Sequence, residues 1–408
     1  MPDTTGDTTG SAAGGTTGPL AGVRVIDLSS MMAGPHCARL LADQGADVIK
    51  VESLTGDHMR NLRPRRKGQS RFFGQLNVGK RSVALDLKQP RGHAALMALV
   101  SRADVVIEAW RPGVAAKLGL GYEDCRPVND RLVYCSISGY GQQGPDAGRA
   151  AFAPVIHAAS GYDMAMLPYQ APGSPPPTTG VYIGDILGGT VAYGSVLTAL
   201  LRRDRTGAGG RVDVSLVDSM MSVLVYELQA VQAGITDTRV SHPPLPTLDG
   251  WIAVTIVNDT GWSAMCRAMG RPELAGDDRY RDIGARTEHW DEMQATMAAW
   301  SRGLSTDEAE SRLLAAGVPA ARHRTPADLL DDAHLTGRRT FPQVADAAGE
   351  FRAMSAPFRI DDAVTPAAGA RVPALGEHTV EVLESVAGLP AAAVREMVDA
   401  GIAGVQGS

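Results

Sequence analysis

Residues 23–51 read VRVIDLSSMMAGPHCARLLADQGADVIKV, and this stretch predicts the fold class. Val23–Leu28 is a short, mostly apolar run, as expected for a strand buried in a parallel sheet. A turn at Met31–Pro35 leads into a helical stretch, Cys37–Gln44, and Asp47–Val51 is a second apolar run. A strand, a helix and another strand at this spacing form one βαβ unit of a doubly wound sheet.

The same alternation continues further along the chain. We expect more strands at Arg81–Leu87, Asp104–Glu108, Leu132–Ile137 and Arg211–Leu216, with helices at Gly92–Arg102, Gly188–Arg203 and Asp218–Gln232. Parallel strands joined by crossover helices are covered on both faces, which explains why most of these strands are apolar. The sequence therefore predicts an α/β protein whose large domain is Rossmann-like and doubly wound.

The chain has 408 residues, enough for two or three domains. We assign residues 19–225 to the large domain, which a carboxyl-terminal segment, 335–408, completes. Residues 226–334 hold linkers and a smaller α/β domain that opens with a strand at Trp251–Val257. Residues 1–18 consist mostly of Thr, Gly, Ala, Asp and Pro, a composition typical of a disordered tail.

Charge and composition argue against several classes of protein. The formal net charge is -6, whereas surfaces that bind nucleic acid or anionic membranes carry a basic excess. We find no signal peptide and no apolar run near the ~18–20 residues that span a bilayer. The four cysteines are widely spaced and no metal-ligand cluster is visible, so we expect a cytoplasmic protein with reduced thiols and no metal.

The common nucleotide and hydrolase motifs are missing. Gly34-Pro35 stands where a dinucleotide-binding protein has G-x-G-x-x-G after the first strand. The chain also contains no P-loop, G-x-S-x-G or H-E-x-x-H motif. Nucleotide redox chemistry and phosphoryl transfer therefore have no supporting motif.

Asp185 is the most suggestive side chain for chemistry. It stands in VYIGDILGG, residues 181–189, where an apolar helical stretch begins. In one interpretation it is an N-cap whose oxygen accepts from free backbone N–H groups. In the other, Gly184, Gly188 and Gly189 leave room for a ligand beside a reactive carboxylate, and free amides stabilise an oxyanion. Taken alone, such an Asp is more often a cap.

An ordered series of short motifs covers about residues 19–390. In chain order they are VID (25–27), AGP (33–35), GADVIKVE (45–52), GKRS (79–82), LDLK (85–88), ADVVIE (103–108), PG (112–113), GYG (139–141), GD (184–185), RTG (205–207) and LGEHT (375–379). Each motif is weak singly. Together they resemble the class III coenzyme A transferases, the family of formyl-CoA transferase and carnitine CoA-transferase.

This resemblance implies a reaction and a set of site residues. In the family, the Asp that matches Asp185 attacks an acyl-CoA thioester, and a covalent relay moves CoA to a carboxylic acid. Acyl-CoA and a small carboxylic acid are then the substrates, with no tightly bound cofactor. The resemblance also implies an interlocked, ring-like homodimer. The matching CoA-contacting positions are Ala33, Leu85, Asp86, Leu87, Lys88, Ala109, Trp110, Arg111 and Lys117.

Three positions depart from formyl-CoA transferase. Met32, Ser53 and Ala109 stand where that enzyme has Gln, Arg and Asn. These replacements remove polar groups, so formate and oxalate are poor candidates for the natural acids. We expect a less polar pocket that suits a larger or more apolar acyl group.

Two alternatives to the transferase remain open. The same superfamily contains 2-methylacyl-CoA racemases, which need a His–Asp pair as two bases, and Phe152 occupies the position of their His. His157 lies five residues further on and is expected to be a core or cleft residue. A catalytically silent acyl-CoA-binding protein is the other alternative, and the presence of Asp185 among glycines argues against it.

Overall fold

The computed structural model describes residues 18–235, 241–366 and 370–407. It divides into two compact units, one formed by Met1–Gln229 with Arg338–Ser408 and the other by Ala230–Gly337. The first unit therefore combines the amino-terminal half with the carboxyl-terminal segment. The predicted tail, residues 1–18, lies outside the described residues apart from Gly18.

A seven-stranded sheet forms the centre of the first unit. Its order is β14 (Ala403–Gly404), β5 (Arg81–Leu85), β2 (Asp47–Glu52), β1 (Arg24–Asp27), β6 (Val105–Glu108), β7 (Val133–Ser138) and β8 (Gly210–Ser215). All pairs are parallel except β14 with β5. Counted along the chain, the six parallel strands follow the order 3-2-1-4-5-6 of a doubly wound dinucleotide-binding sheet. The predicted α/β class with a large, mostly parallel sheet is confirmed.

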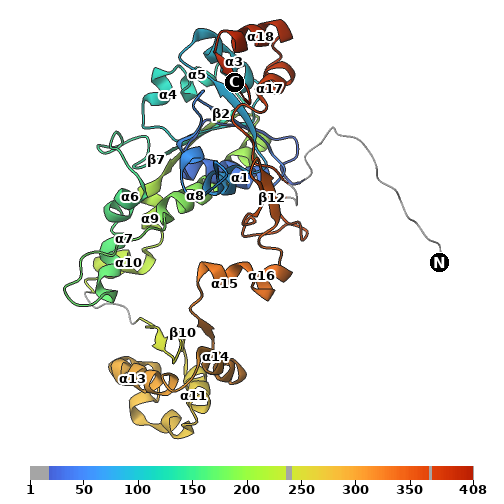
Figure 1. The fold of residues 1–408 in the computed structure, drawn as a ribbon. Helices are drawn as coiled ribbons and strands as arrows, with labels where there is room; N and C mark the ends of the chain where they lie inside the picture. Colours follow the sequence, from blue (N-terminus) through green and yellow to red (C-terminus); the bar gives the residue numbers. More distant parts are fainter. Residues whose placement is uncertain (1–17, 236–240, 367–369, 408) are drawn as a thin grey trace. The chain divides into compact units, whose positions relative to one another are not determined.

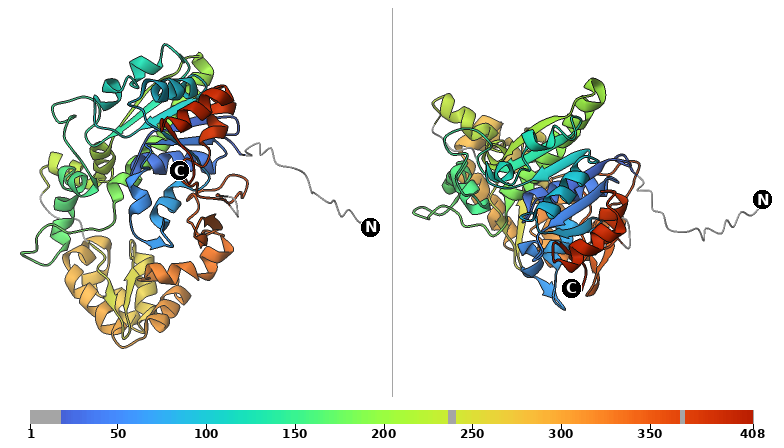
Figure 2. Two further views of the ribbon diagram at one scale, coloured as in Figure 1. Left: turned by 45° about the horizontal axis from the view of Figure 1, so that its top comes forward. Right: turned by 90° about the horizontal axis from the view of Figure 1, so that it is seen from above.

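Helices cover both faces of this sheet because successive residues of a buried strand point to opposite sides. Ile26 faces a core that contains α3 (Pro90–Val100), α17 (Thr379–Ser385) and α18 (Ala391–Asp399). Val25 faces a core that contains α1 (Ala33–Asp43), α8 (Ile183–Thr206) and α9 (Leu216–Met221). Figure 1 shows α3 near α17 and α18, and Figure 2 shows these last two helices, in red, against the sheet.

Shorter elements complete the first unit. They are η1 (His58–Asn61), β3 (Arg65–Arg66), β4 (Gln69–Ser70), α2 (Arg71–Asn77), α4 (Val114–Lys117), α5 (Tyr122–Cys125), α6 (Ala153–Ala159), α7 (Tyr162–Met166), η2 (Leu167–Tyr169), β12 (Gln343–Asp346) and β13 (Gly349–Arg352). Helix α10 (Val225–Gln232) runs across the boundary between the units.

The second unit has its own core around a three-stranded antiparallel sheet. The strands are β11 (Ala320–Arg322), β10 (Trp251–Val254) and β9 (Leu245–Pro246). The helices are α11 (Asp259–Ala268), η3 (Pro272–Gly276), η4 (Asp278–Tyr280), α12 (Ile283–Glu288), α13 (Trp290–Ser301), α14 (Thr306–Ala315), α15 (Pro326–Leu330) and α16 (Ala333–Gly337). Trp262 and Tyr280 pack edge to face in this core, with ring centroids 5.1 Å apart.

Several predicted helix boundaries were wrong. Helix α1 begins at Ala33 and not at Cys37. Pro35 is tolerated in its first turn, because backbone N–H groups there have no partner within the helix and the missing N–H of proline therefore costs no hydrogen bond. Helix α8 begins at Ile183, five residues before the predicted Gly188. The predicted helix Asp218–Gln232 is two helices, α9 and α10, separated by Ser222–Leu224.

By length and composition, α8 could cross a membrane, contrary to the expectation that no segment could. Its 24 residues are mostly apolar or small between Asp185 in the first turn and the basic last turn, where Arg203 and Arg205 lie. In the first unit, Ala192, Val196 and Leu200 of this helix pack into the core beside α1. Its other face exposes Ile186, Val191 and Leu201, so only part of this apolar helix is buried among the described residues.

A buried ion network holds the carboxyl end of β1. The Lys80 ammonium donates to Asp27 Oδ2, Asn77 Oδ1 and Pro35 O, each at 2.9 Å. Lys50 donates to Ser29 O at 2.8 Å and pairs with Asp57 Oδ2 at 3.0 Å. Lys80 and Asp27 are fully buried. Together these bonds fix the loop from Leu28 to Met32, which joins β1 to α1.

We predict that Lys80→Met destabilises the protein severely. The substitution leaves the Asp27 carboxylate buried without this partner, and breaking a buried pair in this way costs about 3–5 kcal/mol. The midpoint of urea unfolding, followed by circular dichroism, should fall accordingly. Lys117→Met is the matched control, because Lys117 is exposed and should change the midpoint little. Equal midpoints for the two variants would contradict the importance of the network.

Candidate active site

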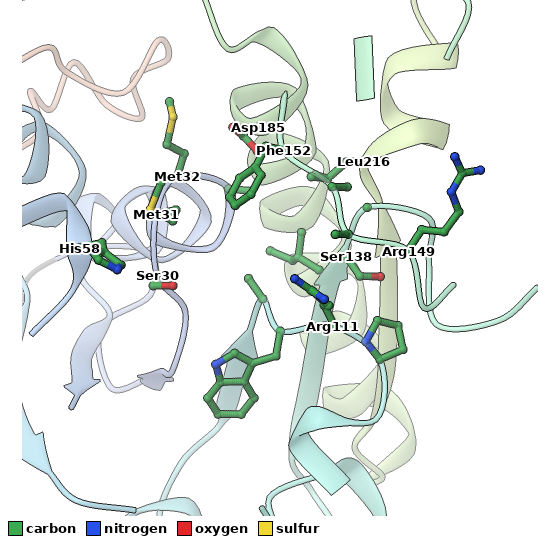
Figure 3. A pocket seen from close by; sticks show the side chains of 18 of the residues that line it. Ser30, Met31, Met32, His58, Arg111, Ser138, Arg149, Phe152, Asp185 and Leu216 are labelled. Carbon is green, nitrogen blue, oxygen red and sulfur yellow. The ribbon is translucent and has the colours of Figure 1, made fainter. Parts of the chain in front are cut away.

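A cavity of about 430 Å³ opens at the carboxyl ends of β1, β6 and β7. Its wall contains Ser30–Ala33, which follow β1, and Ala109–Pro112, which follow β6. Chain order reverses between β1 and β6, and in doubly wound sheets ligands bind at this switch point. Asp185 and Phe152 lie beside each other at one side of this cavity, which we call the central cavity (Figure 3).

A second cavity, of about 510 Å³, lies at the carboxyl ends of β2 and β5. Residues 50–58 and 85–88 line it, and it shares Ser30, His58 and Trp110 with the central cavity. We call it the outer cavity. Because the two cavities have wall residues in common, they form adjoining parts of one groove that runs along the strand ends toward Asp185.

A third cavity, of about 460 Å³, lies on another side of Asp185. It shares Met31, Met32, Leu62, Phe152 and Asp185 with the central cavity. Its remaining wall is Met59, Arg63, Phe72, Ala153, Pro154 and Tyr182. Since Asp185 and Arg63 are its only charged residues, we call it the apolar cavity. Asp185 thus lies where the central and apolar cavities meet.

Asp185 has an unusual environment for a carboxylate. It lies in the first turn of α8, and no hydrogen bond or ion pair joins its side chain to any residue of the described ranges. Burial raises its pKa from 3.8 to about 6, because the charged form loses hydration without gaining a partner. The N-cap residue is Tyr182, so Asp185 is not the cap that one interpretation of the sequence predicted.

The glycines around Asp185 serve packing and not ligand space, which corrects our expectation. A Cβ on Gly188 would overlap the Leu216 side chain, and one on Gly189 would lie 2.5 Å from Ala33 O. These glycines let α8 approach α1 and α9 closely. The space beside the carboxylate comes instead from the loops after β1 and before α6.

His157 holds the amino-terminal end of α8 in place. Its Nε2 accepts the Gly184 N–H at 3.0 Å, and its ring is buried, as expected for a core residue. Burial lowers the pKa of this ring, so the neutral form that can accept this bond is favoured. The Gly184 amide is therefore occupied and is not one of the free donors that we expected for an oxyanion.

The structure brings most of the predicted site residues to this groove. Ala33, Ala109, Trp110 and Arg111 line the central cavity together with Asp185. Leu85, Asp86, Leu87, Lys88 and Trp110 line the outer cavity. Asp86 Oδ1 accepts the Lys88 N–H at 3.0 Å, so this carboxylate shapes the turn after β5. Lys117 lies on α4 and lines none of the three cavities, although its neighbour Leu118 lines the outer one.

Several lining residues were not predicted from the sequence. Leu62, Arg63, Phe72 and Tyr182 line the apolar cavity, and Arg149 lines the central cavity. They come from short loops and helix ends, where no periodic pattern marks a functional side chain. The adjacent Met31 and Met32 also line the apolar cavity, and flexible methionine side chains suit adaptable apolar packing near a cleft.

The departures from formyl-CoA transferase lie in these walls. Met32 and Ala109 line the central cavity, and Ser53 lines the outer one. Phe152 is 65% exposed and presents a phenyl ring next to Asp185, where a racemase would need a base. In the part of the chain that the structure describes, no three His, Cys, Asp or Glu side chains gather as a metal site would require.

The sequence matches the model of a known family over residues 20–379, described as CoA-transferase family III. The succinyl-CoA–D-citramalate CoA-transferase of Chloroflexus aurantiacus is 34% identical over 91% of this chain and 94% of its own. The succinyl-CoA:mesaconate CoA-transferase of Haloarcula marismortui is 34% identical over 90% and 96%. The formyl-CoA:oxalate CoA-transferase of Streptomyces avermitilis is 32% identical over 91% and 96%.

Solved structures agree with this relationship. A CAIB/BAIF family protein from Brucella suis superposes with a TM-score of 0.79 and 31% identity, over 90% of this chain and 99% of its own. A hypothetical protein from Mycobacterium tuberculosis gives a TM-score of 0.81 and 28% identity, over 91% and 100%. With a family model matched over nearly the whole chain and relatives this similar, the chain belongs to CoA-transferase family III.

Proposed function

We propose that this protein transfers CoA from an acyl-CoA thioester to a carboxylic acid, with Asp185 as the covalent nucleophile. One observation carries the proposal: a carboxylate of raised pKa, which has no partner among the residues that the structure describes, lies where the central and apolar cavities meet. The groove on one side of Asp185 runs past the ends of five strands, β5, β2, β1, β6 and β7, which suits an extended ligand such as CoA. The apolar cavity on the other side suits the acyl group.

Each step of the proposed reaction exchanges one acyl bond for another. The Asp185 carboxylate attacks the thioester carbonyl carbon, the C–S bond breaks, and a mixed anhydride and the CoA thiolate form. The thiolate attacks the aspartyl carbonyl, which releases the first acid as its carboxylate and leaves an aspartyl-CoA thioester. The acceptor carboxylate attacks that thioester and forms a second mixed anhydride with release of the thiolate. Attack of the thiolate on the new acyl carbonyl gives the product and restores Asp185.

The environment of Asp185 supports this role. A carboxylate that is well hydrated and ion-paired is a poor nucleophile, and Asp185 has lost part of its hydration without gaining a partner. Arg111, which also lines the central cavity, is suited to the anionic groups of CoA as a charge contact. Trp110 borders both the central and the outer cavity, where it can pack along the pantetheine chain.

The cavity walls favour acyl groups larger than formyl. Met31, Met32, Phe152 and Phe72 give the apolar cavity a hydrocarbon surface, and its volume lies in the range of typical small-molecule pockets. We therefore propose an acyl group of several carbons, such as the succinyl group named for two of the relatives. An interlocked homodimer, implied by the family resemblance, stays part of the proposal.

We predict that hydroxylamine traps the covalent intermediate at Asp185. Incubation with a suitable acyl-CoA should convert this residue to its hydroxamate, and peptide mass spectrometry would locate the change. Asp185→Asn is the matched control, which should lose transfer by several orders of magnitude and show no modification. An unmodified Asp185 across a broad acyl-CoA panel, in a protein that still binds CoA, would overturn the mechanism and favour a silent binding protein.

The raised pKa of Asp185 predicts the acid limb of the pH profile. Only the carboxylate form is nucleophilic, and its fraction falls about tenfold for each pH unit below about 6. The rate of Asp185 acylation, followed without hydroxylamine as acyl-CoA-dependent release of the CoA thiol, should therefore drop across pH 7 to 5 with a midpoint near 6. A midpoint near 4, the ordinary value for Asp, would contradict the burial that we describe.

The same raised pKa predicts a stability change that does not depend on catalysis. The folded protein binds the Asp185 proton more tightly than the unfolded chain, so stability falls as the pH rises from about 4 to 6. Asn cannot ionise. Asp185→Asn should therefore be more stable than the wild type at pH 7.5, by up to about 3 kcal/mol, and equally stable below pH 4. Calorimetric melting at the two pH values measures this difference, and no gain at pH 7.5 would contradict it.

A further inference from the structure

We propose that Arg63 selects dicarboxylic acyl groups by binding the carboxylate at the far end of the acyl chain. This inference rests on the proposed function, because it places the acyl group in the apolar cavity next to Asp185. It adds a specificity-determining residue that the transfer mechanism itself does not require.

The first observation is the charge pattern of the apolar cavity. Among the described residues of its wall, Asp185 and Arg63 alone are charged, and the rest of the lining is methionine, leucine, proline, alanine and aromatic side chains. Asp185 is accounted for by the reaction at the thioester carbonyl. Arg63 is exposed at the edge of this apolar lining, and an arginine side chain in such a place is suited to an anionic group of the ligand.

The second observation is that Arg63 has no protein partner. No hydrogen bond or ion pair joins its side chain to any residue within 18–235, 241–366 or 370–407. Two neighbouring arginines, Arg60 and Arg65, differ in this respect, whereas Arg66 likewise has no partner within those residues. Arg60 donates to both Glu52 oxygens, at 2.7 and 2.8 Å, and Arg65 donates to Gly68 O at 3.0 Å. The Arg63 guanidinium is therefore free to bind a ligand.

The local backbone positions Arg63 beside the other cavity residues. The Arg71 N–H donates to Pro64 O at 2.9 Å, which closes the base of the β3–β4 hairpin directly after Arg63. Ser70 Oγ then accepts the Phe73 N–H at 3.1 Å and caps α2, the helix that carries Phe72. Arg63 and Phe72, at the two ends of this closed segment, both line the apolar cavity.

The other cavity arginines are less suited to the far end of the acyl chain. Arg149 pairs with Asp146 at 3.0 Å and lies over the Tyr140 ring, so an anion in the protein already partners it. Arg111 and Arg149 line the central cavity and not the apolar one. Arg111 therefore lies on the side of Asp185 that we assign to CoA.

The chemistry distinguishes two classes of acyl group. The thioester end of every acyl-CoA is uncharged, so a monocarboxylic acyl group brings no charge to Arg63. A dicarboxylic acyl group, such as succinyl, ends in a carboxylate that two parallel N–H groups of a guanidinium can bind. The intervening methylene groups would lie against the apolar wall.

The test compares two donors that differ at the far end of the chain. Succinyl-CoA and butyryl-CoA both carry four-carbon acyl groups, and only the first ends in a carboxylate. The second-order rate of Asp185 modification in hydroxylamine is measured for each donor, which requires no knowledge of the natural acceptor. Arg63→Gln should lower the preference for succinyl-CoA over butyryl-CoA about tenfold. Arg63→Lys keeps a positive charge and should therefore retain part of this preference.

Arg66→Gln is the matched control. Arg66 is an exposed arginine of the same hairpin that lines none of the three cavities, so its removal should leave the preference unchanged. The inference would be overturned if Arg63→Gln slowed Asp185 modification equally with both donors, or if Arg66→Gln lost the same preference. Either result would leave the proposed function intact. A wild-type Asp185 that no acyl-CoA modifies would overturn the proposed function and this inference together.

Discussion

The buried pair between Lys80 and Asp27 is the interaction on which the site depends. Asp27 is the last residue of β1, and the Lys80 ammonium joins it to Pro35 O in the first turn of α1. A buried charge pair is tolerated only when its remaining donors and acceptors are satisfied, and here Asn77 and Ser29 complete the set. The loop between β1 and α1 cannot move without breaking these bonds. That loop forms one wall of all three cavities.

Strand order then decides where a ligand can lie. Chain connections leave β1 and β6 in opposite directions, so their following loops separate and open a groove at the carboxyl ends of the strands. The groove reaches from the ends of β2 and β5 to Asp185, and the apolar cavity continues beyond it. An extended thioester suits this arrangement, because its CoA portion and its acyl portion need different surroundings on the two sides of one nucleophile.

Asp185 is the place where stability and the proposed chemistry conflict. Helix α8 packs closely against α1 and α9 through glycines, and His157 holds its first turn through the Gly184 amide. This packing presents the carboxylate to the cavities with no partner in the described part of the chain, and burial raises its pKa. Such unpaired groups lower stability and are expected where a protein needs reactivity.

By itself, the sequence determined the doubly wound α/β class. Its ordered motifs also indicated the CoA-transferase family and Asp185 as the candidate nucleophile. Strands such as β1 and β6 have short apolar centres flanked by charged residues, so local pattern suffices to recognise them. Only the tertiary structure decided how α8 begins, what its glycines do, and which residues surround the carboxylate. Leu62, Arg63, Phe72 and Phe152 meet at Asp185 from separate loops and helix ends, and no local period records such contacts. The physical reason is that a cavity wall depends on packing between distant segments, whereas a strand or helix depends mostly on its own residues.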